Sequence, residues 1–296
     1  MKPDFMVIGA QKCATSWLDF HLRQHPQIAL PADKDIEFFS YTANLNLEFS
    51  KAWLNRFEGA AAGQRVGDVN AAYFWTETGS SWGVKEASFN RHIPESVHGF
   101  LGQDMQFIVS LRNPVDRTVS AYLHHISHGG VSPDQSLLEI SEPLGIVDMG
   151  FFGAHLQNWL QVYPASQFLV LMDLPSDQAN ADRLISGTLD FLGVNAATRG
   201  HDSEKKVFPG MQRLRLEGGV WVPEDNPVIT AHLPIQRKVP TITENGKRYL
   251  RLVDSDELAQ LEQIFNADQA LLHDLLAAEG MTVLNPTNLQ SKVNKS

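Results

Sequence analysis

The sequence contains a single cysteine, Cys13, among its 296 residues. One cysteine excludes an internal disulfide, which is typical of proteins in a reducing compartment, and we expect a cytoplasmic location. The apolar runs, such as residues 168–172, are far shorter than the ~20 residues of a membrane-spanning helix. The N-terminal segment lacks the long apolar stretch of a secretory signal. We therefore expect no membrane partner.

Positive charge is also scarce in this chain. Lys and Arg number 24 against 34 Asp and Glu, which gives a formal net charge of −10. This balance disfavours binding to nucleic acid, anionic membranes or polyanionic polysaccharides. The eleven histidines are scattered, without a pair spaced to ligate a metal from one helix face, and we expect no metal site. Any anion that binds must be held by local groups.

The rest of the composition is that of a folded protein, with 43% hydrophobic and 20% charged residues. Short apolar strands are predicted at residues 5–8, 107–111 and 168–172. Helical patterns lie between and after them, at residues 15–22, 114–127, 155–163 and 181–192. Strands that alternate with helices indicate a central parallel sheet flanked by helices on both faces. We expect a single α/β domain over residues 1–284.

The C-terminal third has a different pattern. Residues 195–253 are richer in Gly, Pro and charge, and we expect irregular loops over the site there. Residues 254–279 show the pattern of an amphipathic helix that stops at Gly280. Its buried side is expected to carry Leu258, Leu261, Ile264, Phe265, Leu271, Leu272, Leu275 and Leu276. The polar tail, residues 285–296, is expected to be mobile.

The segment GAQKCATSW, residues 9–17, joins the first predicted strand to the first helix. It supplies a permissive glycine, the cation Lys12, small residues and two hydroxyls. A helix N-terminus offers free N–H groups and a positive dipole end to an anion, so this segment has the parts of a phosphate-binding loop. The alternative is an ordinary strand-to-helix turn with a solvated lysine.

The spacing of this loop differs from the G-x-x-x-x-G-K-[ST] loop of nucleoside triphosphatases. It resembles the 5′-phosphosulfate loop of sulfotransferases that use 3′-phosphoadenosine 5′-phosphosulfate (PAPS), commonly G-x-x-K-[small]-G-T-[TS], with Ala14 for the usual glycine. A second segment, LRNPVDRTVSAY at residues 111–122, resembles the 3′-phosphate motif of the same family. In it, Asn113 suits a helix N-cap and Pro114 the first helical turn.

This resemblance implies a P-loop NTPase-like sulfotransferase fold of the Golgi-type and bacterial branches. It implies PAPS as co-substrate, 3′-phosphoadenosine 5′-phosphate (PAP) as product, and no metal. Lys12 would stabilise the leaving phosphate, and Arg112 with Ser120 would hold the 3′-phosphate. The other donor-binding positions that the resemblance indicates are Gln11, Cys13, Ala14, Thr15, Ser16, Trp17, Phe152, Lys205 and Lys206.

The segment KDIEFF, residues 34–39, resembles the family segment K-E-x-x-F-F, in which the acidic residue is the general base. Asp35 occupies that position with a side chain one methylene shorter. Glu37 is the alternative base, because an extended segment would place both carboxylates on one side and a helix would separate them. Lys34 precedes the pair and is expected to contact the acceptor.

The segment GDVNAAYF, residues 67–74, resembles a diverged G-E-x-[ST]-P-x-Y. It places Asp68 at an acidic position that would order the acceptor or Lys34. Val69 stands where heparan-type enzymes have a lysine, so we expect a small hydroxylated metabolite or a neutral glycan as acceptor.

His124 and His125 follow Ser120 and are candidate acceptor contacts, although lone histidines are more often structural. The acceptor pocket is expected to come from loops near residues 42–53, 76–96 and 200–240.

Two other functions remain open at this stage. A phosphate-transferring kinase is possible because Asp173 ends an apolar strand, as does the aspartate that supports magnesium in such enzymes. A non-catalytic nucleotide-binding relative is possible because Asp35, Val69 and Phe152 depart from the family pattern. The oligomeric state is not indicated.

Overall fold

The computed structural model describes the N-terminal two-thirds of the chain almost continuously, and less of the rest. The described residues are 1–83, 86–127, 130–131, 135–173, 177–195, 214–217, 220–223, 241–244, 247–250, 253, 255–278 and 280–284.

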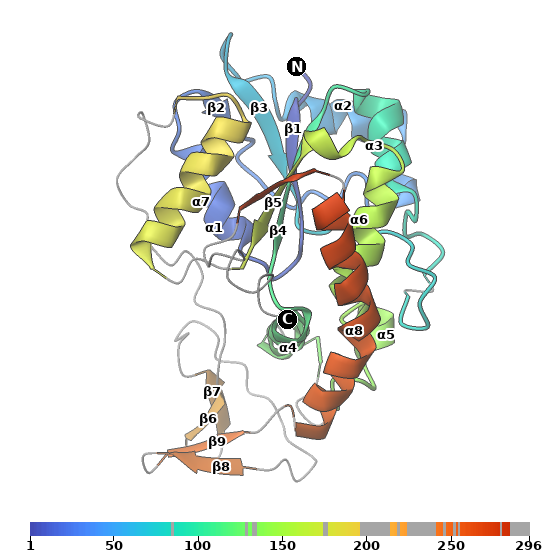
Figure 1. The fold of residues 1–296 in the computed structure, drawn as a ribbon, viewed down its shortest axis with the longest axis vertical. Helices are drawn as coiled ribbons and strands as arrows, with labels where there is room; N and C mark the ends of the chain where they lie inside the picture. The colour runs from blue at the N-terminus through green and yellow to red at the C-terminus, as the bar shows by residue number, and fades with distance from the viewer. Residues whose placement is uncertain are drawn as a thin grey trace.

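A six-stranded parallel sheet forms the centre of the molecule (Figure 1). Its strands, in the order β10-β5-β4-β1-β3-β2, are β1 (Phe5–Gly9), β2 (Ile28–Ala29), β3 (Arg65–Val69), β4 (Gln106–Leu111), β5 (Phe168–Met172) and β10 (Thr282–Leu284). Strand β1 lies between β3 and β4, with Phe5 opposite Gly67 on one side and Gln106 on the other. All five residues of β1 are buried, because apolar side chains point to both covered faces.

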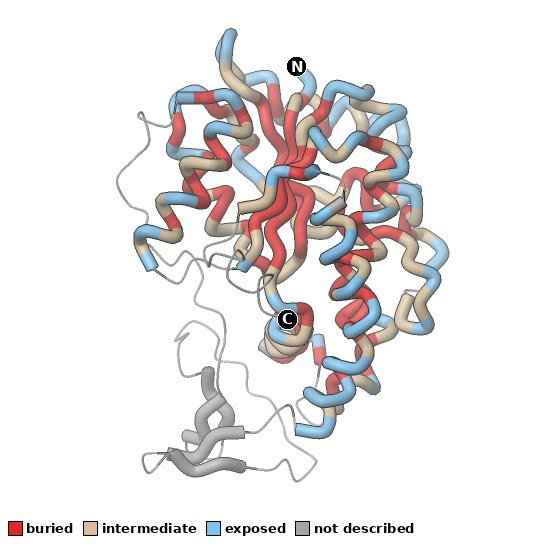
Figure 2. The backbone as a smooth tube through the Cα atoms, viewed as in Figure 1, coloured by how far each residue is buried: buried red, intermediate tan, exposed pale blue. Residues whose placement is uncertain are grey.

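Helices cover both faces of this sheet, and Figure 2 shows the buried strands between more exposed helical layers. On one face, α1 (Thr15–Arg23) and α7 (Gln178–Phe191) pack on Phe5 and Val7. On the other face, the apolar cluster includes Met6 and Ile8 and side chains from α2 (Leu47–Asn55), α3 (Ile93–Leu101) and α6 (Phe152–Leu160). The alternation of β1 side chains therefore joins the two layers into one domain.

A third apolar cluster lies where α4 (Pro114–Ser127) meets α8 (Ser255–Ala278). The short helices α5 (Ser141–Leu144) and η2 (Asp148–Gly150) are in this region, and η1 (Thr42–Asn44) and η3 (Ala165–Gln167) lie elsewhere on the surface. Helix α8 also packs along α6 (Figure 1). No described helix has both the length and the apolar character needed to span a membrane.

The single α/β domain with a parallel sheet confirms the predicted fold class. Strands β1, β4 and β5 and helices α1, α4 and α8 lie where the sequence predicts them, whereas α6 and α7 each begin three residues earlier than predicted, at Phe152 and Gln178. Strands β2, β3 and β10 were not predicted.

Two expectations for the C-terminal third need correction. Within residues 195–253, four strands pair as an antiparallel sheet rather than being loops throughout: β6 (Leu214–Glu217), β7 (Val220–Pro223), β8 (Thr241–Glu244) and β9 (Lys247–Leu250). On α8, Leu258 is exposed rather than buried, because it lies in the first turn, before Leu261 begins the packed stripe. The tail, residues 285–296, lies outside the described residues.

Candidate functional site

The loop after β1 is held in an unusual backbone conformation. Gly9 accepts no side chain, because a Cβ there would lie 2.5 Å from the Cβ of Phe74. Lys12 and Ala14 have φ angles of 66° and 65°. The left-handed region costs about 1–2 kcal/mol for each non-glycine residue, so other contacts must stabilise the loop.

Those contacts come from β4 and α4. The Ala10 N–H donates to the carbonyl oxygen of Ser110 at 2.8 Å, and the Ser110 hydroxyl donates to the carbonyl oxygen of Cys13 at 2.6 Å. From α4, Arg117 donates to Gln11 twice: Nε to the main-chain oxygen at 3.1 Å and Nη2 to Oε1 at 2.6 Å. The loop is therefore fixed at both ends and in the middle.

The N-terminus of α1 has donors without helical acceptors. The N-cap, Ala14, has no side chain able to cap the helix, and the first turn has no acidic residue. The N–H of Leu18 bonds to the Ala14 oxygen at 3.1 Å, so the N–H groups of Thr15, Ser16 and Trp17 precede the intrahelical ladder. Such an end fits an anion through both its donors and the helix dipole.

The charge at this loop is strongly positive. Burial lowers the pKa of the Lys12 ammonium, and the nearby cations Arg117, Arg112 and Lys34 lower it further. Burial raises the pKa of the Cys13 thiol to about 12, so this side chain is a neutral filler of the loop. An anion bound here would offset the repulsion among the cations.

The second predicted anion-binding motif starts α4. The Asn113 side chain caps the helix, accepting from the N–H groups of Val115 at 2.9 Å and Asp116 at 3.2 Å. The Arg112 guanidinium is within 3.8 Å of the Asp116 carboxylate. Asp116 and Ser120 are four residues apart on one helix face, so Arg112 lies on the side of α4 that carries Ser120. Ser120 is partly exposed.

The predicted base segment lies at the carboxyl end of β3. The Asp35 N–H donates to the carbonyl oxygen of Val69 at 2.9 Å, and the Asp35 carboxylate accepts from the Ala71 N–H at 3.0 Å. The Lys34 ammonium donates to the other Asp35 oxygen. With a φ of 56° and an exposed side chain, Asp35 is a fixed carboxylate that solvent can reach.

The charge of Asp35 acts on the neighbouring Glu37. Burial raises the pKa of Glu37, the negative charge of Asp35 raises it further, and a hydrogen bond from the Tyr41 hydroxyl opposes the shift. The two carboxylates therefore differ in environment: one is exposed and paired with a lysine, the other is less exposed and bonded to a tyrosine. Both stay candidates for the base.

Asp68 is a buried residue of β3 rather than part of the acceptor surface. Its side chain is 1% exposed and its carboxylate is 3.5 Å from the Arg56 guanidinium, whereas the ammonium of Lys34 contacts Asp35. Burial raises the pKa of Asp68 to about 6, against the lowering effect of Arg56. Any effect of Asp68 on the acceptor is therefore indirect.

Phe152 has no exposed surface and packs near Phe74 with ring centroids 6.4 Å apart. In this structure it is a core residue, so it does not present its ring to a nucleotide as expected. Trp17 is partly exposed and contacts the His21 ring edge-on at 4.9 Å, and its contact with the donor stays a prediction. Lys205 and Lys206 lie outside the described residues.

His124 and His125 occupy the last turn of α4, with ring centroids 6.0 Å apart. His124 is one turn beyond Ser120 on the same helix face. Asp173, on which the kinase interpretation depends, follows β5, and β4 separates that strand from β1. Among the described residues, no three His, Cys, Asp or Glu side chains form a group that could hold a metal.

One residue of the site was missed by sequence reasoning. Ser110 lies inside an apolar strand and bonds to the loop only because β4 is next to β1. Arg117 lies within the motif of residues 111–122, where its spacing from Asn113 places it near the helix stripe of Ser120, but its complete burial was not predicted.

The sequence of the loop and of most of the described domain is similar to that of known proteins. A model of the sulfotransferase domain family matches residues 2–207. Heparan sulfate glucosamine 3-O-sulfotransferase 6 of Mus musculus is 28% identical over 228 residues, covering 73% of this chain and 60% of the relative. Bifunctional heparan sulfate N-deacetylase/N-sulfotransferase 2 of Homo sapiens is 24% identical over 240 residues, covering 73% of this chain and 25% of the relative.

A crystal structure of a sulfotransferase from Alicyclobacillus acidocaldarius has a similar fold. Its TM-score is 0.63 with 20% sequence identity, over 94% of this chain and 96% of that one. The chain thus spans about three-fifths of the mouse relative's length, whereas it is similar in extent to the bacterial structure.

Proposed function

This chain belongs to the sulfotransferase domain family, and from that premise we propose that it transfers a sulfuryl group from PAPS to an acceptor hydroxyl or amine. Two alternatives have less support. A kinase is disfavoured because the loop lacks the spacing of the triphosphatase loop. A non-catalytic relative is disfavoured because a carboxylate that could act as the base accompanies the loop.

One observation supports this proposal more than any other. Two anion-binding elements follow adjacent strands: the uncapped N-terminus of α1 after β1, and the Arg112–Ser120 face of α4 after β4. The carboxyl ends of neighbouring parallel strands meet at one edge of a sheet. A nucleotide with phosphates at its 5′ and 3′ positions would fit such a pair of elements.

PAPS supplies the sulfuryl group and the leaving phosphate. The N–H groups of α1 and the Lys12 ammonium bind the 5′-phosphate and stabilise the charge that develops on its bridging oxygen. Asp35, or Glu37 in its place, takes the proton as the acceptor atom bonds to sulfur and the bond from sulfur to the bridging oxygen breaks. The Ala71 N–H holds the Asp35 carboxylate in place for this step.

For the acceptor, we propose a neutral small molecule or neutral glycan. Although the relatives are named for heparan sulfate, Val69 stands here where heparan-type enzymes have a lysine. Whichever of Asp35 and Glu37 is the base, the other carboxylate lies close to it, and Glu86 acts on Tyr41 nearby. A polyanionic acceptor would be repelled by these charges.

Calorimetry with PAP, 5′-AMP and 3′-AMP tests donor recognition. We expect PAP to bind more tightly than either monophosphate, and Arg112→Ala to weaken PAP about tenfold to a hundredfold while sparing 5′-AMP, because a charged hydrogen bond to the 3′-phosphate is lost. Arg183→Ala, on the exposed face of α7, is the matched control. Equal affinity of PAP and 5′-AMP in the unchanged protein would overturn the proposal.

A mass-spectrometric screen tests the transfer itself. Enzyme and PAPS are added to mixtures of neutral oligosaccharides, small alcohols and amines, and desulfated heparan, and products that gain a sulfuryl group are identified. We expect product from the neutral classes, and loss of product in Lys12→Ala even at PAPS concentrations that saturate the variant. Sulfated heparan as the sole product would contradict the acceptor class, and PAP binding without any product would indicate a non-catalytic relative.

A further inference from the structure

Arg117 is a cation in the protein interior, directly behind the phosphate loop. Its side chain has no exposed surface, and burial lowers its pKa to about 10. The guanidinium therefore stays charged at neutral pH. Burying a charge is strongly unfavourable unless it is paired and hydrogen-bonded.

The hydrogen bonds of this guanidinium are present, but its ion pair is not. It donates to the main-chain and side-chain oxygens of Gln11, to the carbonyl oxygen of Ile146 and to the Met149 sulfur at 3.1 Å. No carboxylate of the described chain is recorded within ion-pair distance of it. The negative charge of Asp148 raises the pKa of Arg117, but the hydrogen bonds of that carboxylate are accepted from Trp75, Thr78 and Ser80.

The charge of Arg117 acts on Lys12 in the loop. It is the largest electrostatic influence on Lys12 after burial, lowering that lysine's pKa ahead of Arg112 and Lys34. Its two bonds to Gln11 also restrain the residue next to Lys12, whose backbone is left-handed. One side chain therefore both shapes the loop and supplies part of its positive potential.

We propose that Arg117 is a positioning residue for the donor's 5′ end: it holds the phosphate loop through Gln11, and its unpaired buried charge is balanced by the anion that the loop binds. The guanidinium does not touch the ligand. This inference rests on the proposed function, because it takes the anion to be the 5′-phosphate of the donor nucleotide.

Calorimetry with separate monophosphates tests the proposal. In Arg117→Gln we expect 5′-AMP affinity to fall at least tenfold and 3′-AMP affinity to stay within twofold, because only the 5′ loop loses its support. Arg117→Lys keeps the charge and should recover most of the 5′-AMP affinity. Equal losses for both nucleotides would indicate general damage to α4, which carries Ser120, and would overturn the proposal, as would no loss at all.

The pH dependence of 5′-AMP binding separates an electrostatic role of Arg117 from a purely structural one. Lys12 must be protonated to hold the phosphate, so affinity falls as pH rises through its lowered pKa. Removing the neighbouring charge raises that pKa, so the basic limb of 5′-AMP binding should move to higher pH in Arg117→Gln and stay in place in Arg117→Lys. If the basic limb of 5′-AMP binding does not move in Arg117→Gln, the claim that the charge of Arg117 acts on Lys12 is contradicted.

A milder variant keeps the test decisive if Arg117→Gln does not fold. Gln11→Ala removes the Oε1 acceptor and leaves the arginine charge, so 5′-AMP should bind several-fold more weakly with 3′-AMP unchanged. Unchanged 5′-AMP binding in Gln11→Ala would overturn the claim that Arg117 holds the loop through Gln11. If the unchanged protein binds neither nucleotide, the proposed function fails instead, which is a distinct result.

Discussion

A single buried carboxylate shows how position in the sheet changes the chemistry of a residue. Asp68 is on β3 with 1% exposure, one oxygen lies 3.5 Å from Arg56, and its other oxygen has no hydrogen-bond partner in the described structure. Burial raises its pKa to about 6. The folded protein therefore holds a proton on Asp68 over a pH range in which the unfolded chain has released it.

The change Asp68→Asn should alter how stability depends on pH. Between about pH 4 and pH 6 the folded state binds more protons at this site than the unfolded state, so this group contributes less stability as pH rises. The wild type should lose up to about 3 kcal/mol relative to Asp68→Asn over that window, at about 1.4 kcal/mol per pKa unit. Urea unfolding at pH 4 and pH 6.5 measures the difference.

The exposed Asp104→Asn is the control for this experiment. Its stability relative to the wild type should not follow the same trend. A difference between wild type and Asp68→Asn that stays constant across the window would show that the folded-state pKa of Asp68 is not raised.

At the scale of elements, α6 and α8 pack against each other although they are far apart in the chain (Figure 1). The Asp268 carboxylate of α8 accepts from the N–H groups of Gly153 at 2.9 Å and Ala154 at 2.8 Å. It therefore caps the first turn of α6 from a neighbouring helix. A Cβ on residue 153 would lie 2.6 Å from the Asp268 carbonyl oxygen and 2.9 Å from the Leu272 nitrogen.

Gly153→Ala should destabilise the protein by about 1–3 kcal/mol, because backbone atoms on α8 would have to move. The matched variant is Gly99→Ala in α3, where a Cβ meets nothing within 4 Å. That substitution should stabilise by about 0.5–1 kcal/mol, since alanine loses less backbone freedom in a helix. Thermal or urea unfolding of the two variants measures these changes in stability, which should have opposite signs. Equal changes in the two variants would argue against the contact of α6 with α8.

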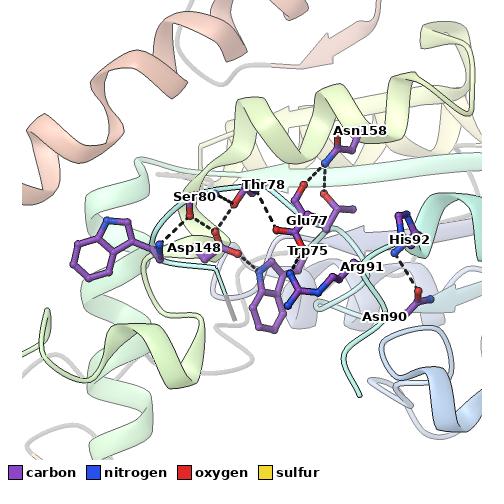
Figure 3. A network of polar contacts seen from close by, with 12 residues as sticks. Trp75, Glu77, Thr78, Ser80, Asn90, Arg91, His92, Asp148 and Asn158 are labelled. Carbon is purple, nitrogen blue, oxygen red and sulfur yellow. Dashed lines mark hydrogen bonds and ion pairs between the residues drawn. The ribbon is translucent and has the colours of Figure 1, made fainter. Parts of the chain in front are cut away.

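At the scale of the whole molecule, a buried polar network joins the loop after β3 to α6 and η2 (Figure 3). Asp148 accepts from Trp75 Nε1 at 2.7 Å, Thr78 Oγ1 at 2.6 Å and Ser80 Oγ at 2.7 Å. His155 Nδ1 accepts from the Thr76 N–H at 3.2 Å, which leaves Nε2 to donate to the Asp148 carbonyl oxygen at 2.9 Å.

The same network lies next to Arg117, which supports the loop after β1. Arg117 donates to the carbonyl oxygen of Ile146 and contacts the Met149 sulfur, on either side of Asp148. The η2 segment is therefore held by Arg117 and by the loop after β3. Burial lowers the pKa of His155, so this histidine stays neutral and keeps the tautomer that the two bonds require.

Asp148→Asn should disrupt this arrangement, because an amide NH₂ would face donors that a carboxylate oxygen now accepts. We expect a loss of about 2–4 kcal/mol in the free energy of unfolding, and faster amide hydrogen exchange in residues 75–82 than in β1. Asp190→Asn, at an exposed position on α7, is the control. If both variants had the same stability and exchange pattern, the network would have no role in ordering the loop.

Much of the fold could be predicted because its signals are local. Strands β1, β4 and β5 are continuous apolar runs, and α4 begins with an asparagine cap followed by proline, which the structure confirms. Strand β3 was missed because RVGDV has no apolar run. It is a strand because it pairs with β1, with Gly67 opposite Phe5 and leaving room for its ring.

The sequence by itself indicated the family, which the family match confirms, and it predicted the phosphate loop and the Arg112 and Ser120 motif, since each depends on residue types at short spacing. Only the tertiary structure decided which side chains share an environment. It buried Arg117 behind Gln11, paired Asp68 with Arg56 and placed Phe152 in the core. These outcomes depend on contacts between elements far apart in the chain, and burial and charge are properties of that assembled surrounding rather than of a residue and its neighbours in sequence.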